Sequence, residues 1–280
     1  KLKSFPAISW LDDKLFTVEA GNALYKVNFA DGTSQLLNSW NADQDNKDIA
    51  SETYYVAYTL GNNLFVSLNG KEKAVTNDSE KNIVNGQSVH RNEFGINKGT
   101  FWSPKGNLLA FYRMDQTMVT DYPIINIDER TAVDEPVKYP MAGMKSHEVT
   151  VGVYNPVTGS VIYLKTGEPK EQYLTNISWS DDEKTIYIAI VNRAQNHMWL
   201  NAYDASDGNF LRTLIEESDK EYVEPLTGLT FLKTRPEEFI RQSRVDGWNH
   251  LYLYETSGRL IVQLTKGNWE VDEFLGLDAD

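Results

Sequence analysis

Apolar and polar residues alternate in short runs along most of the chain, as over Leu251–Tyr254. Alternation of this kind, with many Val, Ile and Tyr residues, predicts half-buried β-strands. The runs gather into a repeated unit in which an aromatic residue ends one strand and a turn leads into a hairpin. Three clear copies and two weaker ones follow one another along the chain, at Ser9–Val18, near Thr53, at Phe101–Tyr112, at Ser178–Ile190 and near Leu229.

A repeat made of strands alone, with a period of roughly 40–50 residues, indicates a β-propeller in which each repeat forms one blade. The interval between Trp10 and Trp102 leaves room for one copy midway, and a strand over Tyr54–Tyr58 is expected there. We therefore predict an all-β propeller of four-stranded antiparallel blades, with about five to six blades visible. The Trp and Tyr residues at the blade starts are expected to wedge into the core.

The fourth unit displays all four strands of a predicted blade. They are expected, from the inner strand to the outer one, over Asn176–Ser180, Thr185–Val191, Met198–Tyr203 and Phe210–Leu214. The turn Ala205–Gly208 separates the last two strands, and its glycine supplies the positive φ that tight hairpins require.

Near the end of the chain, Asn268–Leu275 has the pattern of the inner strand of a sixth blade. A propeller normally closes on itself and hides its sheet edges. A chain that stops partway through a blade at Asp280 is therefore expected to be a fragment of a larger propeller.

Two segments interrupt the repeat. Residues 77–99 lack strand alternation, and residues 116–145 form a long insertion within the third blade. Loops of this length inside a compact domain often carry function, although a surface excursion that only packs is an equal alternative.

Composition narrows the function further. The formal charge of the 280 residues is −13, and no cluster of Lys or Arg interrupts it, which disfavours nucleic acids and anionic membranes as partners. Cysteine is absent, so disulfides and thiolate chemistry are excluded. No apolar run approaches the roughly 18 residues of a membrane span. The four histidines show no metal-ligand spacing, and Asp43, Asp45 and Asp48 are interpreted as a solvated turn, so neither metal nor cofactor is expected.

Seven ordered motifs carry a more specific signal. They are Asn85–Gly95, Gly99–Gly106, Ala110–Asp115, Tyr139–Gly143, Val191–Asn196, Asp246–Tyr254 and Thr265–Val271. Together they resemble the N-terminal propeller domain of the dipeptidyl peptidase IV family of serine peptidases. Within that family, Ser88–Gly95 and Phe111–Gln116 are most similar to the prolyl tripeptidyl aminopeptidase branch of Bacteroidetes-type bacteria.

The resemblance implies that residues 1–280 form one domain of an eight-bladed propeller that lies over an α/β-hydrolase domain. The hydrolase domain is expected after Asp280 and would carry the catalytic Ser, Asp and His. No catalytic residue is expected in this chain, which has no Gly-x-Ser-x-Gly elbow. The resemblance also implies a periplasmic or secreted location and a parent protein that forms a homodimer.

In the family, two consecutive glutamates of the propeller bind the free α-ammonium of the substrate. The aligned positions here are Asn92 and Glu93, so only one acid is present. The family also uses an arginine from an earlier propeller loop to bind a substrate carbonyl, and residues 1–80 contain no arginine. This role is therefore either missing, carried by another residue such as Arg91 or Arg113, or carried by residues outside this chain. The alternative for Arg113 is an ion pair with Asp115.

The sequence therefore leaves two alternative functions open. The first is a domain that gates access to a serine exopeptidase and binds the N-terminus of peptides containing proline, with release of Xaa-Xaa-Pro or Xaa-Pro. The second is a non-enzymatic propeller scaffold for protein or glycan partners, since propellers host unrelated functions.

Overall fold

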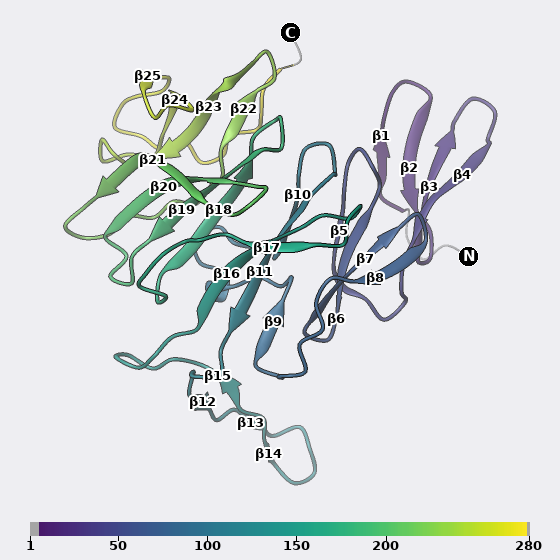
Figure 1. Ribbon diagram of the computed structural model, residues 1–280, viewed down its shortest axis with the longest axis horizontal. Helices are drawn as coiled ribbons and strands as arrows, with labels where there is room; N and C mark the ends of the chain where they lie inside the picture. The colour runs from purple at the N-terminus through teal and green to yellow at the C-terminus, as the bar shows by residue number, and fades with distance from the viewer. Residues whose placement is uncertain (1–5, 279–280) are drawn as a thin grey trace.

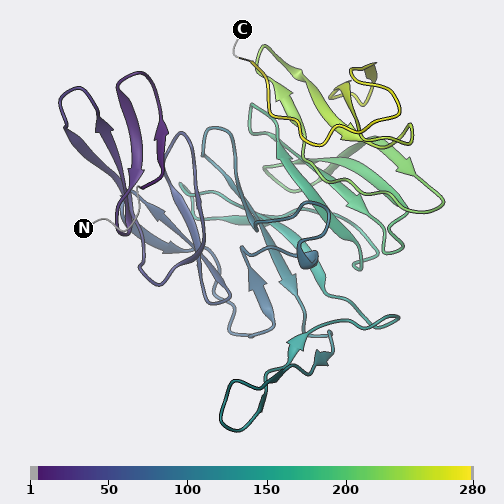
Figure 2. The same ribbon diagram turned by 180° about the vertical axis from the view of Figure 1, so that it is seen from behind.

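The computed structural model describes residues 6–278, and every regular element in this part of the chain except one short 3-10 helix is a β-strand. The strands form five main antiparallel sheets that follow one another in chain order. Figures 1 and 2 show these sheets side by side along an arc, with the N-terminal sheet at one end and the C-terminal sheet at the other. The predicted all-β fold of four-stranded blades is confirmed, whereas the number of blades in a closed propeller stays a prediction.

The first two sheets have four strands each, paired in sequence order. The first sheet consists of β1 (Ile8–Trp10), β2 (Leu15–Glu19), β3 (Ala23–Asn28) and β4 (Ser34–Ser39). The second consists of β5 (Asp45–Ile49), β6 (Val56–Leu60), β7 (Asn63–Leu68) and β8 (Lys71–Ala74).

Two details of the second sheet differ from the prediction. Tyr54 does not begin a strand, because it lies in a turn with a φ of 56° in which its N–H donates to the carbonyl of Ala50 at 3.0 Å. The expected turn around Asp43 is wrong for Asp45 and Asp48, which belong to β5 and pair with β6.

The third sheet is built around β11 (Leu109–Asp115). Its first half pairs with β10 (Thr100–Trp102) and its second half with β9 (Ile83–Asn85) on the same edge, which places a strand inside the segment predicted to be irregular. The other neighbours are β16 (Glu148–Tyr154) and β17 (Val161–Tyr163). Between β9 and β10 lies η1 (His90–Asn92), the 3-10 helix.

Residues 116–145, which connect β11 to β16, form an arm that projects from the molecule (Figure 1). The position of this insertion matches the prediction, but it is more regular than a loop. At its base β12 (Asp121–Tyr122) pairs with β15 (Val137–Lys138), and at its tip β13 (Ile125–Asn126) pairs with β14 (Val133–Asp134).

The fourth and fifth sheets again pair their strands in chain order. The fourth sheet confirms the four predicted strands and extends three of them, as β18 (Tyr173–Trp179), β19 (Thr185–Val191), β20 (His197–Asp204) and β21 (Phe210–Ser218). The fifth sheet consists of β22 (Thr230–Leu232), β23 (Arg235–Ser243), β24 (His250–Glu255) and β25 (Leu260–Gln263).

The predicted strand over Asn268–Leu275 is not formed. No strand follows β25 within the described residues up to Asp278. A strand requires a row of backbone hydrogen bonds to a neighbour, and here Val271 N–H makes a single one, to the Asn249 carbonyl at 2.8 Å. Asp280 and residues 1–5 of the predicted domain lie outside the described residues.

Apolar side chains from each pair of neighbouring sheets form a shared core. Phe111, for example, packs from the third sheet against the second, whereas its strand neighbour Tyr112 packs toward the fourth. This alternation follows from the two-residue period of a strand. The sheets therefore stack face to face like propeller blades. Among residues 6–278 no helix has the length and apolar character needed to cross a membrane.

Tryptophans tie some of these sheets together as expected. Trp102 Nε1 donates to the Asp48 carbonyl of the second sheet at 3.1 Å, and Trp179 Nε1 donates to the Phe101 carbonyl of the third sheet at 3.0 Å. Trp10 does not act as a core wedge, because its side chain is 54% exposed. No sheet precedes β1 in the described residues, so the position that Trp102 and Trp179 fill against an earlier sheet has no counterpart.

Candidate functional site

The segment that includes η1 has an unusual backbone. His90, Arg91 and Asn92 have φ values of 52°, 54° and 62°, and Phe94 follows with 56°. A left-handed conformation costs a residue other than glycine roughly 1–2 kcal/mol. Such strain persists only where surrounding contacts hold it, and it is frequent at functional sites. We refer to residues 90–94 as the left-handed turn.

His90 is the first residue of this turn, and its side chain lies in the core, where it is 3% exposed. Its Nε2 accepts the Leu174 N–H of β18 at 3.1 Å, so Nδ1 must carry the proton of the neutral ring. Nδ1 then donates to Nε2 of His147 at 2.9 Å. Burial, together with His147 and Arg193 nearby, holds the pKa of His90 well below its usual range.

Arg91 points to the arm. Its guanidinium lies 4.2 Å from the centre of the Tyr139 ring and donates to the Lys138 carbonyl. Arg91 and Asn92 also line a cavity of about 620 Å³ together with His90 and His147. Both ring nitrogens of His90 and one donor of the Arg91 guanidinium thus form hydrogen bonds within the protein.

Glu93 is not among the residues that line this cavity, and its carboxylate lies against the loop between β19 and β20. Its Oε2 accepts a hydrogen bond from Gln195 Nε2 at 3.4 Å, and the same Nε2 donates to the Tyr173 hydroxyl at 3.1 Å. Arg193 donates to this hydroxyl as well, and its guanidinium lies 5.7 Å from the centre of the Tyr173 ring. We refer to Glu93, Tyr173, Arg193 and Gln195 as the Glu93 cluster.

The Glu93 cluster offers an exposed carboxylate close to an exposed guanidinium. Within residues 6–278 the Glu93 carboxylate forms no ion pair, and the one hydrogen bond that it accepts comes from a neutral amide. The carboxylate can therefore accept hydrogen bonds from a cationic ligand, and Arg193 retains donors for an oxygen atom. An α-ammonium group followed by a peptide carbonyl has this combination of charges.

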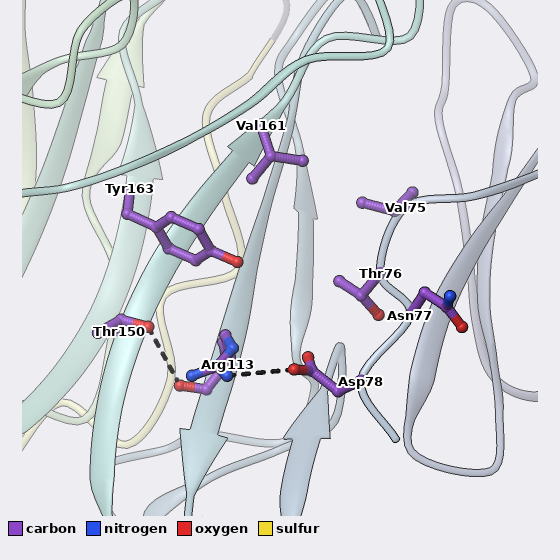
Figure 3. A pocket seen from close by; sticks show the side chains of 8 residues that line it. All are labelled: Val75, Thr76, Asn77, Asp78, Arg113, Thr150, Val161 and Tyr163. Carbon is purple, nitrogen blue, oxygen red and sulfur yellow. Dashed lines mark hydrogen bonds and ion pairs between the residues drawn. The ribbon is translucent and has the colours of Figure 1, made fainter. Parts of the chain in front are cut away.

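Arg113, by contrast, lies in a different cavity. This second cavity, of about 510 Å³, is lined by Val75, Asp78 and Tyr163 among others. Figure 3 shows Arg113 and Asp78 facing each other, with Nη2 and Oδ1 3.2 Å apart. The expected pair of Arg113 with Asp115 is wrong, because the Asp115 carboxylate accepts the backbone N–H and the hydroxyl of Thr117 at 2.9 and 2.7 Å.

The structure thus brings Arg91 and Asn92 to one side of the left-handed turn, places Glu93 on another, and separates Arg113 from all three. Sequence reasoning missed the rest of the Glu93 cluster. Its only signal was the motif Val191–Asn196, which carried the resemblance without suggesting a role. Among residues 6–278, His, Cys, Asp and Glu nowhere form a group of three or more that could hold a metal ion.

Comparisons with known proteins agree on one family. The sequence profile of the dipeptidyl peptidase IV (DPP IV) N-terminal region matches residues 8–280. The dipeptidyl peptidase 4 of Trichophyton tonsurans is 28% identical over 251 residues, which are 80% of this chain and 31% of that protein. The probable dipeptidyl peptidase 4 of Neosartorya fischeri is 26% identical over 242 residues, with the same coverage.

Two solved structures extend this result. A putative dipeptidyl aminopeptidase IV from Bacteroides ovatus is 47% identical, with a TM-score of 0.88 over 96% of this chain and 40% of its own. The dipeptidyl peptidase 4 of Porphyromonas gingivalis has the same fold, with a TM-score of 0.78 over 97% of this chain and 39% of its own at 24% identity. The chain therefore spans less than half the length of these relatives.

Proposed function

The chain belongs to the family of dipeptidyl peptidase IV N-terminal regions, and from this premise we propose that it gates a serine exopeptidase and binds the N-terminus of its peptide substrates. The predicted resemblance to this family is thereby confirmed. In the proposal, the catalytic Ser, Asp and His belong to an α/β-hydrolase domain of the same protein. The limited share of each relative that this chain covers supports a second domain of that kind.

Glu93 carries the proposed binding role. An α-ammonium with a pKa of about 7.7–8.0 is mostly cationic at neutral pH, and a carboxylate without a cationic partner can bind it by a charge-assisted hydrogen bond. The exposed Glu93 carboxylate, bonded only to the neutral amide of Gln195, is the observation on which the proposal depends. Asn92, the second predicted binding residue, lines the cavity on the other side of the turn and is left out of this role.

Arg193 is better placed than Arg91 to bind the first substrate carbonyl. Arg91 is stacked on Tyr139 and bonded to the arm, whereas Arg193 shares the Tyr173 hydroxyl with Gln195 and so belongs to the Glu93 cluster. Arg113 is not needed for this role, because it faces Asp78 in another cavity.

The substrate is proposed to be a peptide with a free N-terminus, from which Xaa-Xaa-Pro is released in preference to Xaa-Pro. The single carboxylate at the positions of the family's glutamate pair supports this order, since a site with one acid fixes the ammonium less strictly. The resemblance supports a periplasmic or secreted location and a homodimeric parent protein.

The test uses the full-length protein and compares peptide substrates that have a free α-amino group with substrates that lack it. Chromogenic Xaa-Xaa-Pro and Xaa-Pro peptides and their desamino analogues would be assayed with wild type and with Glu93→Gln. We expect Glu93→Gln to lower kcat/KM for the free-amine tripeptide by about 10- to 100-fold, because a hydrogen bond to a charged group contributes about 1.5–3 kcal/mol. The desamino substrate should be cleaved equally by both enzymes.

Three outcomes would change the conclusion. Faster release of Xaa-Pro than of Xaa-Xaa-Pro would assign dipeptidyl activity. An equal loss for the free-amine and desamino substrates would contradict a role of Glu93 in ammonium binding. If neither peptide is cleaved, the peptidase function fails and the scaffold for protein or glycan partners takes its place.

A further inference from the structure

We propose that His90 and His147 are positioning residues that fix the left-handed turn, and with it Glu93, at the junction of the arm, the third sheet and the fourth sheet. Neither histidine belongs to the proposed peptide-binding cluster. The functional consequence of this inference rests on the proposed role of Glu93, whereas the structural part does not.

The turn depends on outside support. Three consecutive residues other than glycine have positive φ values, and its internal hydrogen bonds are few. The Asn92 N–H donates to the Val89 carbonyl and the Glu93 N–H to the His90 carbonyl, each at 3.1 Å. Because the backbone of Glu93 is bonded to that of His90, the position of His90 determines that of Glu93.

The His90 ring is held from both sides. Its Nε2 accepts the Leu174 N–H in the fourth sheet, and its Nδ1 donates to His147, one residue before β16 of the third sheet begins. The edge-to-face contact with Tyr173, at 5.0 Å between ring centres, adds a third fixed point. His90 therefore works as a bridge with a defined proton arrangement, since its single N–H serves His147 and its lone pair serves Leu174.

Other residues of the left-handed turn are also held by contacts outside it. Arg91 binds the arm through Tyr139 and Lys138, and Phe94 packs on Tyr173 at 5.1 Å between ring centres. The side chain of Glu93, between these anchors, accepts only the single long hydrogen bond from Gln195. The turn is thus held at the residues that flank Glu93, while the Glu93 carboxylate itself stays available for a ligand.

The experiment uses two amide replacements of His147 in the full-length protein. In His147→Gln the side-chain oxygen can reach the place of Nε2 and accept the His90 proton, whereas in His147→Asn the side chain is one methylene shorter and cannot. Both variants are polar and uncharged, so they differ in reach alone. Amide hydrogen exchange of residues 90–94 and kcat/KM for free-amine and desamino Xaa-Xaa-Pro substrates would be measured for each.

We expect amide exchange in the turn to be at least tenfold faster in His147→Asn and close to wild type in His147→Gln. The preference for the free-amine substrate should fall at least threefold in His147→Asn through a higher KM, with kcat retained, and should be retained in His147→Gln. Wild-type exchange in both variants, or fast exchange in both, would overturn the inference. If His147→Asn does not fold, retained protection in His147→Gln supports the inference and lost protection overturns it.

The two proposals can fail separately. If Glu93→Gln leaves the substrate preference unchanged, the binding role of Glu93 fails, and the exchange data still decide whether the histidines hold the turn. If Glu93→Gln removes the preference while His147→Asn changes neither exchange nor KM, the positioning role fails alone.

Discussion

The hydrogen bond from His90 to His147 requires a neutral His147, because a proton on His147 Nε2 would turn the acceptor into a donor. The hydrogen bond from the Leu174 N–H requires a neutral His90 for the same reason. Burial is the main cause that lowers the pKa of His147, to about 4, and the cationic Arg91 and Arg193 add to it. Burial likewise lowers the pKa of His90. The pair therefore prefers the uncharged state throughout the neutral range.

This preference predicts a pH dependence of stability. In the unfolded chain both histidines titrate near pH 6.5. As the pH falls below that value, the unfolded state binds protons that the folded state excludes, so the free energy of unfolding decreases by up to about 1.4 kcal/mol per pH unit for each histidine. The contribution of His147 is complete above pH 6.5 and stops changing below about pH 4, where the folded state also binds the proton.

Urea unfolding of wild type and His147→Gln between pH 7.5 and pH 4 would test this expectation. Gln does not titrate, so the stability of the variant relative to wild type should rise as the pH falls through the window from about 6.5 to about 4. Parallel curves over this window would contradict the assignment of a neutral His147.

At the same residue scale, the sequence predicted only the part of the site that is local. Arg91, Asn92 and Glu93 are consecutive, so any fold keeps them together. Gln195, which contacts Glu93, lies 102 residues away along the chain, and the spacing of residues contains no trace of such a contact. Arg91 contacts the arm whereas Glu93 contacts Gln195. This difference depends on a backbone with positive φ values, which the residue types Arg and Asn do not demand.

At the scale of elements, strands rich in apolar residues were predicted well and polar strands were not. The four strands of the fourth sheet were foreseen, because apolar residues of β19 pack on both faces in an unbroken run. The strand predicted over Tyr54–Tyr58 forms as β6 but begins two residues later, at Val56. The strand that was missed is β5, which is polar in sequence and owes its existence to pairing with β6. Pairing partners decide such segments, and a single sequence does not name the partner.

The arm yields a prediction at this scale. Its base carries the contacts to Arg91, through Lys138 and Tyr139, whereas its tip exposes apolar side chains such as Ile127, which is 80% exposed. Tyr122 and Val137 are directly paired in the base. Replacement of residues 123–136 by Asn-Gly would join this pair by the two-residue turn that suits a hairpin.

We expect the shortened arm to leave both stability and the left-handed turn unchanged. Stability measured by urea unfolding should stay within about 0.5 kcal/mol of wild type, as for surface changes away from the core, and amide exchange of residues 90–94 should not increase. As a matched control, Tyr139→Leu removes the ring under Arg91 and should speed up exchange in the turn. Faster amide exchange of residues 90–94 in the variant with the shortened arm would show that the tip of the arm also supports the candidate site.

At the scale of the whole molecule, the sheets are held to one another by shared apolar cores and by a few hydrogen bonds that cross between them. Tyr112 in the third sheet donates its hydroxyl proton to the Leu174 carbonyl of the fourth at 2.8 Å, and burial raises the pKa of this hydroxyl, so it stays a donor. Leu174 also donates its N–H to His90. At Leu174, β18 is thus joined to the third sheet through its carbonyl and to the left-handed turn through its N–H.

The tryptophan ties allow the contribution of one such crossing to be measured. Trp179→Phe keeps an aromatic ring, 7% exposed in wild type, but removes the N–H that the Phe101 carbonyl accepts. We expect it to lower the free energy of unfolding by about 1–3 kcal/mol, because a partly buried carbonyl loses its partner and the smaller ring leaves space. Trp10→Phe is the matched control. Its ring is 54% exposed, so the change should stay within about 0.5 kcal/mol.

Equal effects in urea unfolding would mean that the contact between the third and fourth sheets contributes no more than an exposed ring at the edge of the first. A large effect of Trp179→Phe together with faster amide exchange in residues 90–94 would show that the interface between these sheets and the candidate site open as one unit.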